Sequence, residues 1–239
     1  MHNLYNKNGL IFWTQEEIAL RRTLEQYFVT NIEKCLKEQN RAFEMFQCEA
    51  PLLTPRSLIN PNYNEKDMWA WEDNVLRPET TMGSYAYAQH LLNPHNQRKV
   101  KMPLCVWQHG KSFRREQDQP TKFMRLKEFY QLEFQIIFAS NTANDYSLKL
   151  IPSVKKMLEV FVGPCRTEPS DRLPDYAEWT QDVICEKVGN PESPQDMEVC
   201  SMSKRKDFPG ASVLEVAIGT DRCIYNFNRR HHPENLLSE

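Results

Sequence analysis

Arginine and glutamate side chains gather in two segments of this sequence, each at the end of a predicted strand. Phe113-Arg114-Arg115-Glu116 closes one strand, and Gly219-Thr220-Asp221-Arg222 joins the last strand to a helix. A guanidinium is a permanently charged planar fork that suits phosphate and carboxylate groups, and the N–H groups at a helix start also favour anions. The two segments therefore predict binding of a phosphate-bearing or carboxylate ligand.

Two further side chains near the first segment could recognise an adenine ring. Glu116 could accept a hydrogen bond from an exocyclic amine, and Phe129, on the returning strand, offers a flat face for a purine. A hairpin also commonly carries solvated charges, and a Gly-x-Asp-Arg turn is also an ordinary helix start. Each segment by itself leaves the ligand open.

The elements that must position these residues follow from periodicity. The segment 14–39 predicts one long helix, because Thr14 is a candidate N-cap and Ile18, Leu24, Phe28 and Ile32 recur at helical spacing. Further helices are expected at 81–92, 146–162 and 220–228. Strands are expected at 42–50, 75–78, 104–113, 125–138, 182–187, 198–203 and 212–218. Loops or turns are expected at 58–74, 117–122, 168–174 and 189–194.

The strands at 104–113 and 125–138 should form an antiparallel pair around the loop at 117–122. The fold class is therefore α+β, a mostly antiparallel sheet with helices packed against it.

Composition bounds the class of protein. The chain has 239 residues, 40% of them hydrophobic, which suffices for one substantial core and predicts a single domain. A net charge of -2 predicts no global attraction to nucleic acid, so any RNA contact would be local. Seven cysteines without a C-x-x-C pair, no secretion signal and no apolar run of ~20 residues predict a cytoplasmic protein without a membrane span.

Several segments, taken in order, resemble the class II aminoacyl-tRNA synthetases. FRRE followed by RLKEFYQLEF resembles their second signature motif, VLEVAIGTDR at 213–222 the third, and the long helix leading to Pro51 the first, which builds the dimer interface in that family. LRPETTMGSY at 76–85 resembles the loop with which glycyl and histidyl enzymes hold the amino acid. DYAEWTQDV at 175–183 and MEVCSMSKRKDF at 197–208 resemble glycyl enzymes in particular.

This resemblance, over residues 14–228, implies an antiparallel sheet flanked by helices and a ligase that forms aminoacyl-adenylates. It implies one catalytic core domain over 1–239, with a first motif at about 16–55, a second at 104–138 and a third at 212–228. No anticodon-binding domain is expected within it.

The resemblance also assigns roles to residues of an ATP site. Arg114 would bind the α-phosphate and the substrate carboxylate, Glu116 would read the adenine amino group, and Phe129 would stack on adenine. Arg125 would hold the outer phosphates and Arg222 the γ-phosphate side. Val199, Gly219 and Asp221 would complete the ATP site. Glu198 would approach ATP or its Mg²⁺, and the catalytic set would be Arg114, Glu116 and Arg222.

The amino-acid site implied by the same resemblance is acidic. Glu79, Glu133 and Glu215 would surround the substrate ammonium, since three carboxylates around one pocket call for a cation. Arg114, Gln131 and Ala217 would complete that site. The substrate is expected to be a small amino acid, with glycine favoured by the resemblance. Glycyl enzymes have a serine where Ala217 stands, and this difference leaves room for alanine, serine or another small substrate.

The acceptor of the activated amino acid stays open between tRNA and another molecule. ATP and Mg²⁺ are the expected cofactors, and a homodimer is the expected assembly. Two alternatives remain, a catalytically inactive paralogue acting as an accessory or regulatory subunit and an amino acid:carrier ligase of the same fold. Trp69, Trp71 and Trp107 could line the pocket or pack in a core or dimer contact, whereas Cys105 and His109 favour packing over metal binding.

Overall fold

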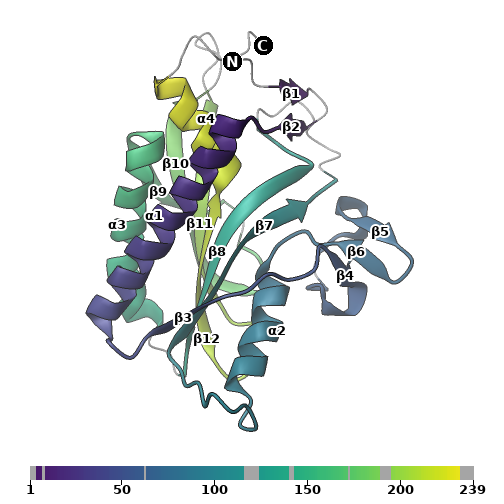
Figure 1. Ribbon diagram of the computed structural model, residues 1–239, viewed down its shortest axis with the longest axis vertical. Coiled ribbons are helices and arrows are strands. Elements are labelled where there is room, and N and C mark those ends of the chain that lie inside the picture. Colours follow the sequence, from purple (N-terminus) through teal and green to yellow (C-terminus); the bar gives the residue numbers. More distant parts are fainter. Residues whose placement is uncertain are drawn as a thin grey trace.

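A seven-stranded sheet forms the centre of the molecule, with three of the four described helices on one face of it and the fourth on the other (Figure 1). The computed structural model describes residues 4–6, 9–61, 63–115, 124–139, 143–171, 173–188 and 195–231. The described helices are α1 (Gln15–Gln39), α2 (Thr81–Leu92), α3 (Ala143–Val162) and α4 (Thr220–His231). None of them combines the length and the hydrophobicity needed to cross a membrane.

The strand order of the large sheet is β3-β7-β8-β12-β11-β10-β9. All neighbours are antiparallel except β3 and β7, which run parallel. Its strands are β3 (Glu44–Gln47), β7 (Leu104–Phe113), β8 (Glu128–Phe138), β9 (Cys165–Pro169), β10 (Ala177–Val188), β11 (Gln195–Arg205) and β12 (Ser212–Gly219). The mostly antiparallel sheet and its flanking helices confirm the predicted fold class.

Helix α1 begins where the sequence predicted. The Thr14 hydroxyl accepts a hydrogen bond from the Glu17 N–H at 3.3 Å, and the Glu17 carboxylate accepts one from the Thr14 N–H at 2.9 Å. This capping box satisfies two N–H groups that the helix cannot bond internally. Leu24, Phe28 and Ile32 then recur on one side and are fully buried against the sheet.

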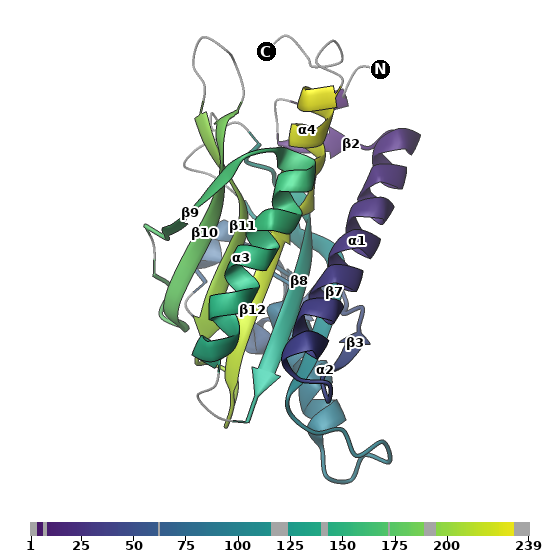
Figure 2. The ribbon, with the colours of Figure 1, turned by 90° about the vertical axis from the view of Figure 1, so that its left-hand side faces the viewer.

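Alternation along the strands separates a hydrophobic face from a polar one. In β8, Leu132 and Phe134 lie in the core under α1, α3 and α4, which Figure 2 shows in front of the sheet. Glu133 lies between them in sequence and points to the opposite face, as Glu215 does between Leu214 and Val216 in β12. The same strands therefore supply the core and the polar side chains of the site.

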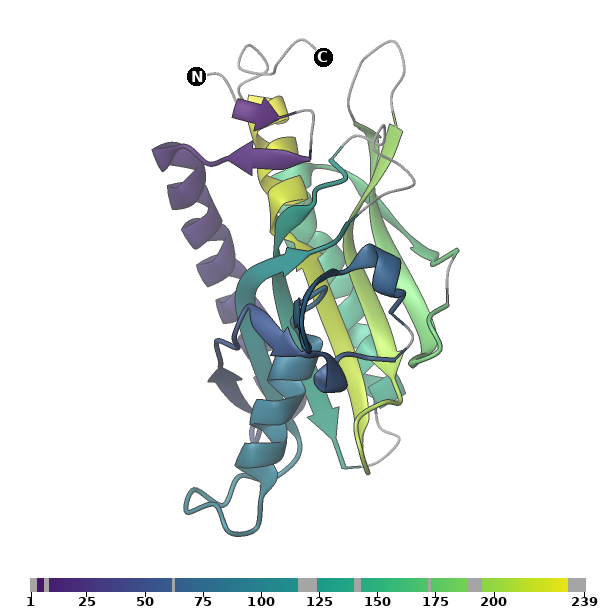
Figure 3. The same ribbon diagram turned by 90° about the vertical axis from the view of Figure 1, so that its right-hand side faces the viewer.

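A second, three-stranded sheet lies on the polar side of the large sheet (Figure 3). Its strands, in the order β4-β6-β5, are β4 (Leu53–Pro55), β6 (Asn74–Leu76) and β5 (Trp69–Trp71). Two short 3₁₀ helices, η1 (Arg56–Leu58) and η2 (Glu65–Asp67), connect β4 with β5, and Val75 packs on Ile59 and Met68 beneath them. A separate hairpin consists of β1 (Leu4–Asn6) and β2 (Leu10–Phe12).

Most predicted elements are confirmed, and two expectations were wrong. The expected loop at 58–74 contains β5, and the expected connection at 168–174 overlaps β9. The strands expected at 182–187 and 198–203 are present and extend further, as β10 and β11. β5 and β9 are short segments without apolar alternation, so their pairing partners, rather than local preference, determine them. The expected loop at 117–122 and turn at 189–194 lie outside the described residues.

Candidate nucleotide and amino-acid site

A polar cavity of about 350 Å³ opens on the face of the large sheet that α1, α3 and α4 leave uncovered. Its floor comes from β8, β11 and β12, and its walls from β10, residues 170–176 and the first turn of α4. Nearly all of the residues predicted for the site line it. They are Glu79, Arg114, Arg125, Phe129, Gln131, Glu133, Glu198, Val199, Glu215, Ala217, Gly219, Asp221 and Arg222. The remaining predicted residue, Glu116, lies outside the described residues.

One end of the cavity is basic and aromatic. The Arg114 guanidinium lies 5.3 Å from the Phe129 ring centroid, and its Nε donates to the Pro78 carbonyl at 3.1 Å. Arg222 donates from Nη1 to the Glu198 carbonyl at 2.7 Å, and its side chain keeps 26% of its surface exposed. Two guanidinium groups held by main-chain carbonyls, one of them beside an aromatic ring, make a site suited to a phosphorylated, planar ligand.

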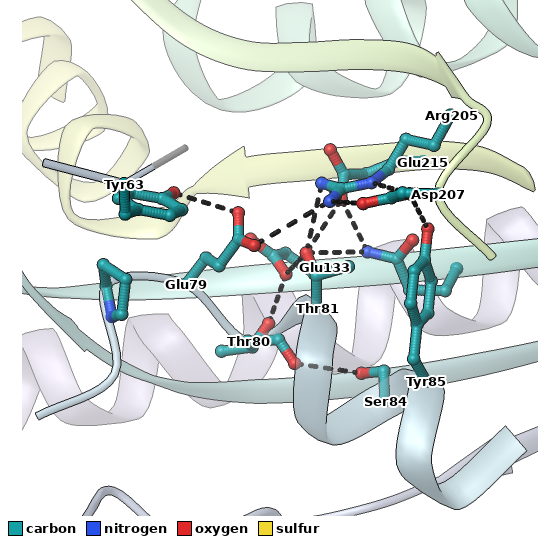
Figure 4. Close-up of polar contacts among 12 residues, drawn as sticks. Tyr63, Glu79, Thr80, Thr81, Ser84, Tyr85, Glu133, Arg205, Asp207 and Glu215 are labelled. Carbon is teal, nitrogen blue, oxygen red and sulfur yellow. Dashed lines mark hydrogen bonds and ion pairs between the residues drawn. The ribbon is translucent and has the colours of Figure 1, made fainter. Parts of the chain in front are cut away.

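The other end of the cavity is acidic and almost fully buried. Glu79, Glu133 and Glu215 are 6%, 2% and 6% exposed, although they come from distant parts of the sequence (Figure 4). Such burial is costly for carboxylates, so partners are required. Thr80 and Thr81, at the start of α2, donate to Glu133 and Glu215, respectively.

The acidic end also contains a protein cation that the sequence reasoning missed. Arg205 is fully buried, and its Nη1 lies 2.9 Å from Glu215 Oε2, whereas its Nη2 lies 3.8 Å from Glu79 Oε1. Asp207 holds the same guanidinium through Nη2 at 2.7 Å, and the Tyr176 ring lies 3.8 Å from its centre. The expectation that three carboxylates need a cation was therefore incomplete, because Arg205 already balances part of their charge.

Hydrogen-bonding capacity nevertheless remains at this end of the cavity. Glu79 accepts from the Tyr63 hydroxyl at 3.0 Å through Oε2, but within the described residues its Oε1 has no hydrogen-bond donor. The Gln131 side-chain oxygen also lacks a donor there. Buried acceptors without donors are uncommon in proteins. A ligand with several N–H donors, such as an ammonium group, would satisfy them.

The pKa values at the acidic end follow from burial and from mutual repulsion. Burial raises the pKa of Glu133 to about 8, and the charges of Glu215 and Glu79 raise it further in the same direction. Burial also raises the pKa of Glu79, while Arg205 opposes that shift. Burial disfavours the charge on Arg205, but Glu215 and Glu79 outweigh it and raise the pKa of the guanidinium. Glu133 is consequently the group that can gain a negative charge when a cation arrives.

Two residues predicted to bind ATP line the cavity but are almost fully buried. Val199 is 1% exposed and packs in the hydrophobic core, so it can face the cavity only through its main chain. Asp221 is 2% exposed, and its Oδ2 accepts a hydrogen bond from the Tyr130 N–H at 2.9 Å. Burial raises the pKa of Asp221 to about 7. The carboxylate thus has a structural partner within the sheet.

Several cavity residues carried no usable signal in the sequence. Arg205 stands between Lys204 and Lys206, a run that is typical of a solvated surface. The other polar lining residues that were not predicted are Ser170, Asp171, Tyr176, Thr180, Asp182, Ser201 and Ser203. Alternation places Ser201 and Ser203 on one face of β11, but Glu198 reaches the same cavity only because the pairing with β10 is shifted between Cys200 and Glu198, which the sequence does not reveal.

The tryptophans do not line the cavity. Trp107 lies in the core, whereas Trp69 and Trp71 are 41% and 72% exposed on the small sheet. Within the described part of the chain, no group of three or more histidine, cysteine, aspartate or glutamate side chains could hold a metal ion by itself. Cys105 is buried in the core, and His109 takes part in a hydrogen-bonded chain described below.

Known glycine–tRNA ligases are similar in sequence to this chain. The sequence is 30% identical to a glycine–tRNA ligase from Mycoplasma capricolum over 241 aligned residues, which cover 90% of this chain and 50% of the relative. It is 29% identical to a glycine–tRNA ligase from Mycoplasma mycoides over 189 residues, which cover 69% of this chain and 41% of the relative. No protein-family model matches the sequence.

The fold is similar to that of a solved aminoacyl-tRNA synthetase. A prolyl-tRNA synthetase from Cryptosporidium parvum, crystallised with halofuginone and AMPPNP, superposes with a TM-score of 0.71 at 14% sequence identity. The match covers 95% of this chain and 50% of that one. The three alignments cover 69% to 95% of this chain. They cover 41% to 50% of the matched proteins, so the chain spans about half of the length of those proteins.

Proposed function

Because this chain has the class II aminoacyl-tRNA synthetase catalytic fold and is similar in sequence to glycine–tRNA ligases, we propose that it activates a small amino acid with ATP. Glycine is the favoured substrate, and the product is the aminoacyl-adenylate. One observation carries the proposal. A single cavity joins an end that suits a phosphorylated purine to an end that suits an ammonium group.

The proposed roles divide along that cavity. Phe129 stacks on adenine, Arg114 binds the α-phosphate and the amino-acid carboxylate, and Arg125 and Arg222 hold the outer phosphates. Glu116, in the adjoining segment, reads the adenine amino group. Glu79, Glu133 and Glu215 receive the substrate ammonium with Gln131, and Ala217 leaves room for a small side chain. The geometry supports this division, because Arg114 lies beside Phe129 and donates to the main chain just before Glu79.

The reaction needs no nucleophile from the protein. The amino-acid carboxylate attacks the α-phosphate, pyrophosphate leaves, and the resulting mixed anhydride can acylate a hydroxyl or an amine. Arg114 would stabilise the negative charge that develops at the α-phosphate, and the buried glutamates would fix the ammonium so that the carboxylate points at phosphorus. Rate enhancement would then come from positioning and from charges already in place.

Magnesium fits this site only together with the nucleotide. Mg²⁺ commonly binds through one or two carboxylates plus phosphate oxygens, and Glu198 offers such a carboxylate at the wall of the cavity, with its side chain 48% exposed. When bound, Mg²⁺ would neutralise charge on the phosphates. Arg222, whose Nη1 lies 3.9 Å from Glu198 Oε1, would hold the neighbouring phosphate oxygens.

We also propose tRNA as the acceptor and the cytoplasm as the location, since the similar proteins are named glycine–tRNA ligases. Residues 1–239 would form one catalytic core. The net charge of -2 means that RNA would be bound through local contacts rather than through overall attraction.

A homodimer is the proposed assembly. The outer face of the small sheet aligns Leu53, Leu76 and Trp69 across its three strands, and Trp71 follows on the same side. Leu53, Trp69 and Trp71 are exposed by 51%, 41% and 72%. Beside them an apolar groove of about 510 Å³ runs between residues 47–58 and α2. Protruding side chains next to a groove suit a two-fold contact in which each copy fills the groove of the other.

The first test is amino-acid-dependent exchange of pyrophosphate into ATP, measured with each of the twenty amino acids. We expect exchange with one small amino acid and at least a hundredfold loss in Arg114→Ala, the size of effect seen when a charge-stabilising donor is removed. Arg56→Ala is the matched control, because Arg56 of η1 forms an exposed ion pair with Glu65 of η2.

The possible outcomes separate the alternatives. Exchange that Arg114→Ala abolishes supports adenylate formation, and transfer of the labelled amino acid to tRNA then tests the acceptor. Exchange without transfer to tRNA would favour a carrier ligase. Absence of exchange with every amino acid, in folded protein supplied with Mg²⁺, would contradict the proposed activity and favour an accessory subunit.

A further inference from the structure

A buried chain of hydrogen bonds links helix α1 to the first turn of α4 on the side of the sheet away from the cavity. Glu25 of α1 contacts His109 Nδ1 of β7 at 2.6 Å, and His109 Nε2 contacts the Thr220 hydroxyl at 3.2 Å. The Thr220 hydroxyl donates to the Tyr130 carbonyl of β8 at 3.1 Å. The His109 side chain is 5% exposed and Thr220 is fully buried, so water competes little for the bond between them, whereas the Glu25 side chain is 32% exposed.

At its α4 end, the chain of hydrogen bonds takes the place of main-chain pairing between β8 and β12. The ladder between β8 and β12 ends at the pair Gln131 and Gly219, where β12 gives way to α4. The carbonyl and N–H of Tyr130, one residue beyond, receive side-chain partners instead, because Thr220 donates to the carbonyl and Asp221 accepts from the N–H. Two consecutive side chains of α4 therefore bond both main-chain groups of one residue.

The directions of these bonds are determined by what each partner can do. The Tyr130 carbonyl only accepts, so the single Thr220 hydroxyl hydrogen is used there, and Thr220 must accept from His109 Nε2–H. The hydrogen bond from His109 lowers the pKa of Glu25, which favours a carboxylate that accepts from Nδ1–H. Both ring nitrogens of His109 are thus engaged, Nδ1 with Glu25 and Nε2 with Thr220.

The exposed cation that this turn presents to the cavity is Arg222. It follows Thr220 and Asp221 directly, lines the cavity and donates to the Glu198 carbonyl at 2.7 Å. A small rotation of the first turn of α4 would be magnified along the long arginine side chain. The hydrogen bonds that hold Thr220 and Asp221 against Tyr130 therefore also fix the main chain at Arg222.

We infer that His109, held by Glu25, is a positioning residue that fixes the first turn of α4 through Thr220 and so aims Arg222 at the nucleotide end of the cavity. This inference rests on the proposed function for its catalytic consequence only. The hydrogen-bonded chain itself can be tested without activity. Tyr130 is clamped on its ring as well, since the Arg21 guanidinium lies 3.8 Å from the ring centroid.

The hydrogen-bonded chain from Glu25 to Thr220 is tested first by nitrogen-15 NMR of the full-length protein labelled in its histidines, with His109→Gln to assign the signal. We expect a ring N–H signal from His109 that exchanges slowly with water, because both ring nitrogens are hydrogen-bonded and the side chain is 5% exposed. A His109 ring that exchanges its hydrogens as fast as the exposed ring of His95 would overturn the inference whether or not the protein is active.

The consequence is tested by pyrophosphate-exchange kinetics on Thr220→Val and Thr220→Ser. Valine keeps the shape but removes both hydrogen bonds, and we expect it to raise the KM for ATP about tenfold, which corresponds to about 1.4 kcal/mol, while the KM for the amino acid stays unchanged. Serine retains both bonds and should behave as wild type. Glu38→Gln, on an exposed part of α1, is the control.

The kinetic outcomes are also decisive. Equal changes in both KM values, or a valine variant that equals wild type, would show that the chain does not act through Arg222 and would overturn the inference. If the wild-type protein shows no pyrophosphate exchange, the proposed function is contradicted instead. The NMR result would then still decide whether the hydrogen-bonded chain from Glu25 to Thr220 is formed.

Discussion

Glu133 is the side chain whose charge depends most directly on conditions in the cavity. Its pKa of about 8 means that near neutral pH most molecules hold it protonated, bonded to Thr80 and close to two other acids. A cationic substrate binds best to the ionised form. The linkage has a definite sign, because cation binding releases a proton from Glu133 and is therefore favoured as pH rises.

We predict that the KM for the amino acid falls roughly tenfold between pH 6.5 and 8, as expected for a proton that competes with the substrate at a group with this pKa. Glu133→Gln should raise the KM and remove its pH dependence. Initial rates of pyrophosphate exchange measured across this range would check both, with Glu44→Gln, an exposed acid of β3, as the control. A wild-type KM that is flat or rises with pH would contradict the prediction.

The same pKa affects stability in the opposite direction. Since the folded pKa of Glu133 lies above the ordinary value of 4.5, the folded protein binds a proton that the unfolded chain releases. The contribution of this group is complete below about pH 4.5 and is lost as pH rises through about 8. The condition that improves cation binding therefore weakens the fold at this residue.

At the scale of residues, the sequence predicted the cavity well where a motif marks it and poorly where packing decides. Arg114, Phe129 and Arg222 lie in motifs, and all three line the cavity. Arg205 lies in a run of basic residues, and its burial depends on contacts with Tyr176 and Glu215, which both lie outside that run. No local pattern reveals that such a guanidinium has entered a carboxylate cluster.

At the scale of elements, helix α2 is placed by close contact with the segment that follows β3. A Cβ added to Gly83 would lie 2.2 Å from the Ala50 Cβ, which is far inside van der Waals contact. The glycine therefore lets the helix approach that segment closely. Because Thr80 and Thr81 stand at the start of this helix, its position also determines where their hydroxyls meet Glu133 and Glu215.

We expect Gly83→Ala to lower the free energy of unfolding by about 1 to 3 kcal/mol, the usual cost of overpacking, even though alanine is the better helix former. Urea unfolding followed by circular dichroism would measure the change. Gln89→Ala, at an exposed position of the same helix, should stay within about 0.5 kcal/mol of wild type. A stabilised Gly83→Ala variant would mean that the close contact does not exist.

Elements with a strong local signal were predictable, and those that depend on neighbours were not. The capping box of Thr14 and Glu17 and the apolar spacing of Leu24 and Phe28 lie within one segment, which is why α1 was found within a residue of its ends. β5 has three residues and exists because Asn74–Leu76 pairs with it. Pairing between segments is a property of the tertiary structure and leaves little trace in a short run of sequence.

At the scale of the whole molecule, the exposed apolar face of the small sheet is the feature that requires a partner. Trp71 is the most exposed of its aromatic side chains at 72%. Large apolar groups gathered beside a groove are typical of protein–protein contacts. The second copy proposed above would cover them.

Sedimentation velocity at micromolar concentration should show a dimer for wild type and a monomer for Trp71→Asp, because a buried, unpaired charge at an interface costs several kcal/mol. Leu148→Asp is the matched control, since Leu148 is exposed by 76% on α3, which packs on the other face of the large sheet. A wild-type monomer, or an unchanged dimer in Trp71→Asp, would contradict the proposed contact.

The alternation along β8 and β12 has a consequence for how such a protein can change. Leu132 and Glu133, or Leu214 and Glu215, are neighbours in the chain but serve the core and the cavity, respectively. Losing one codon from either strand would exchange the two faces beyond that point and place glutamates under α3 and leucines in the ligand cavity. Exchanges of one side chain for another can therefore retune the pocket stepwise, whereas insertions and deletions would be confined to the connecting segments, a rule that a randomised library of this chain would make visible.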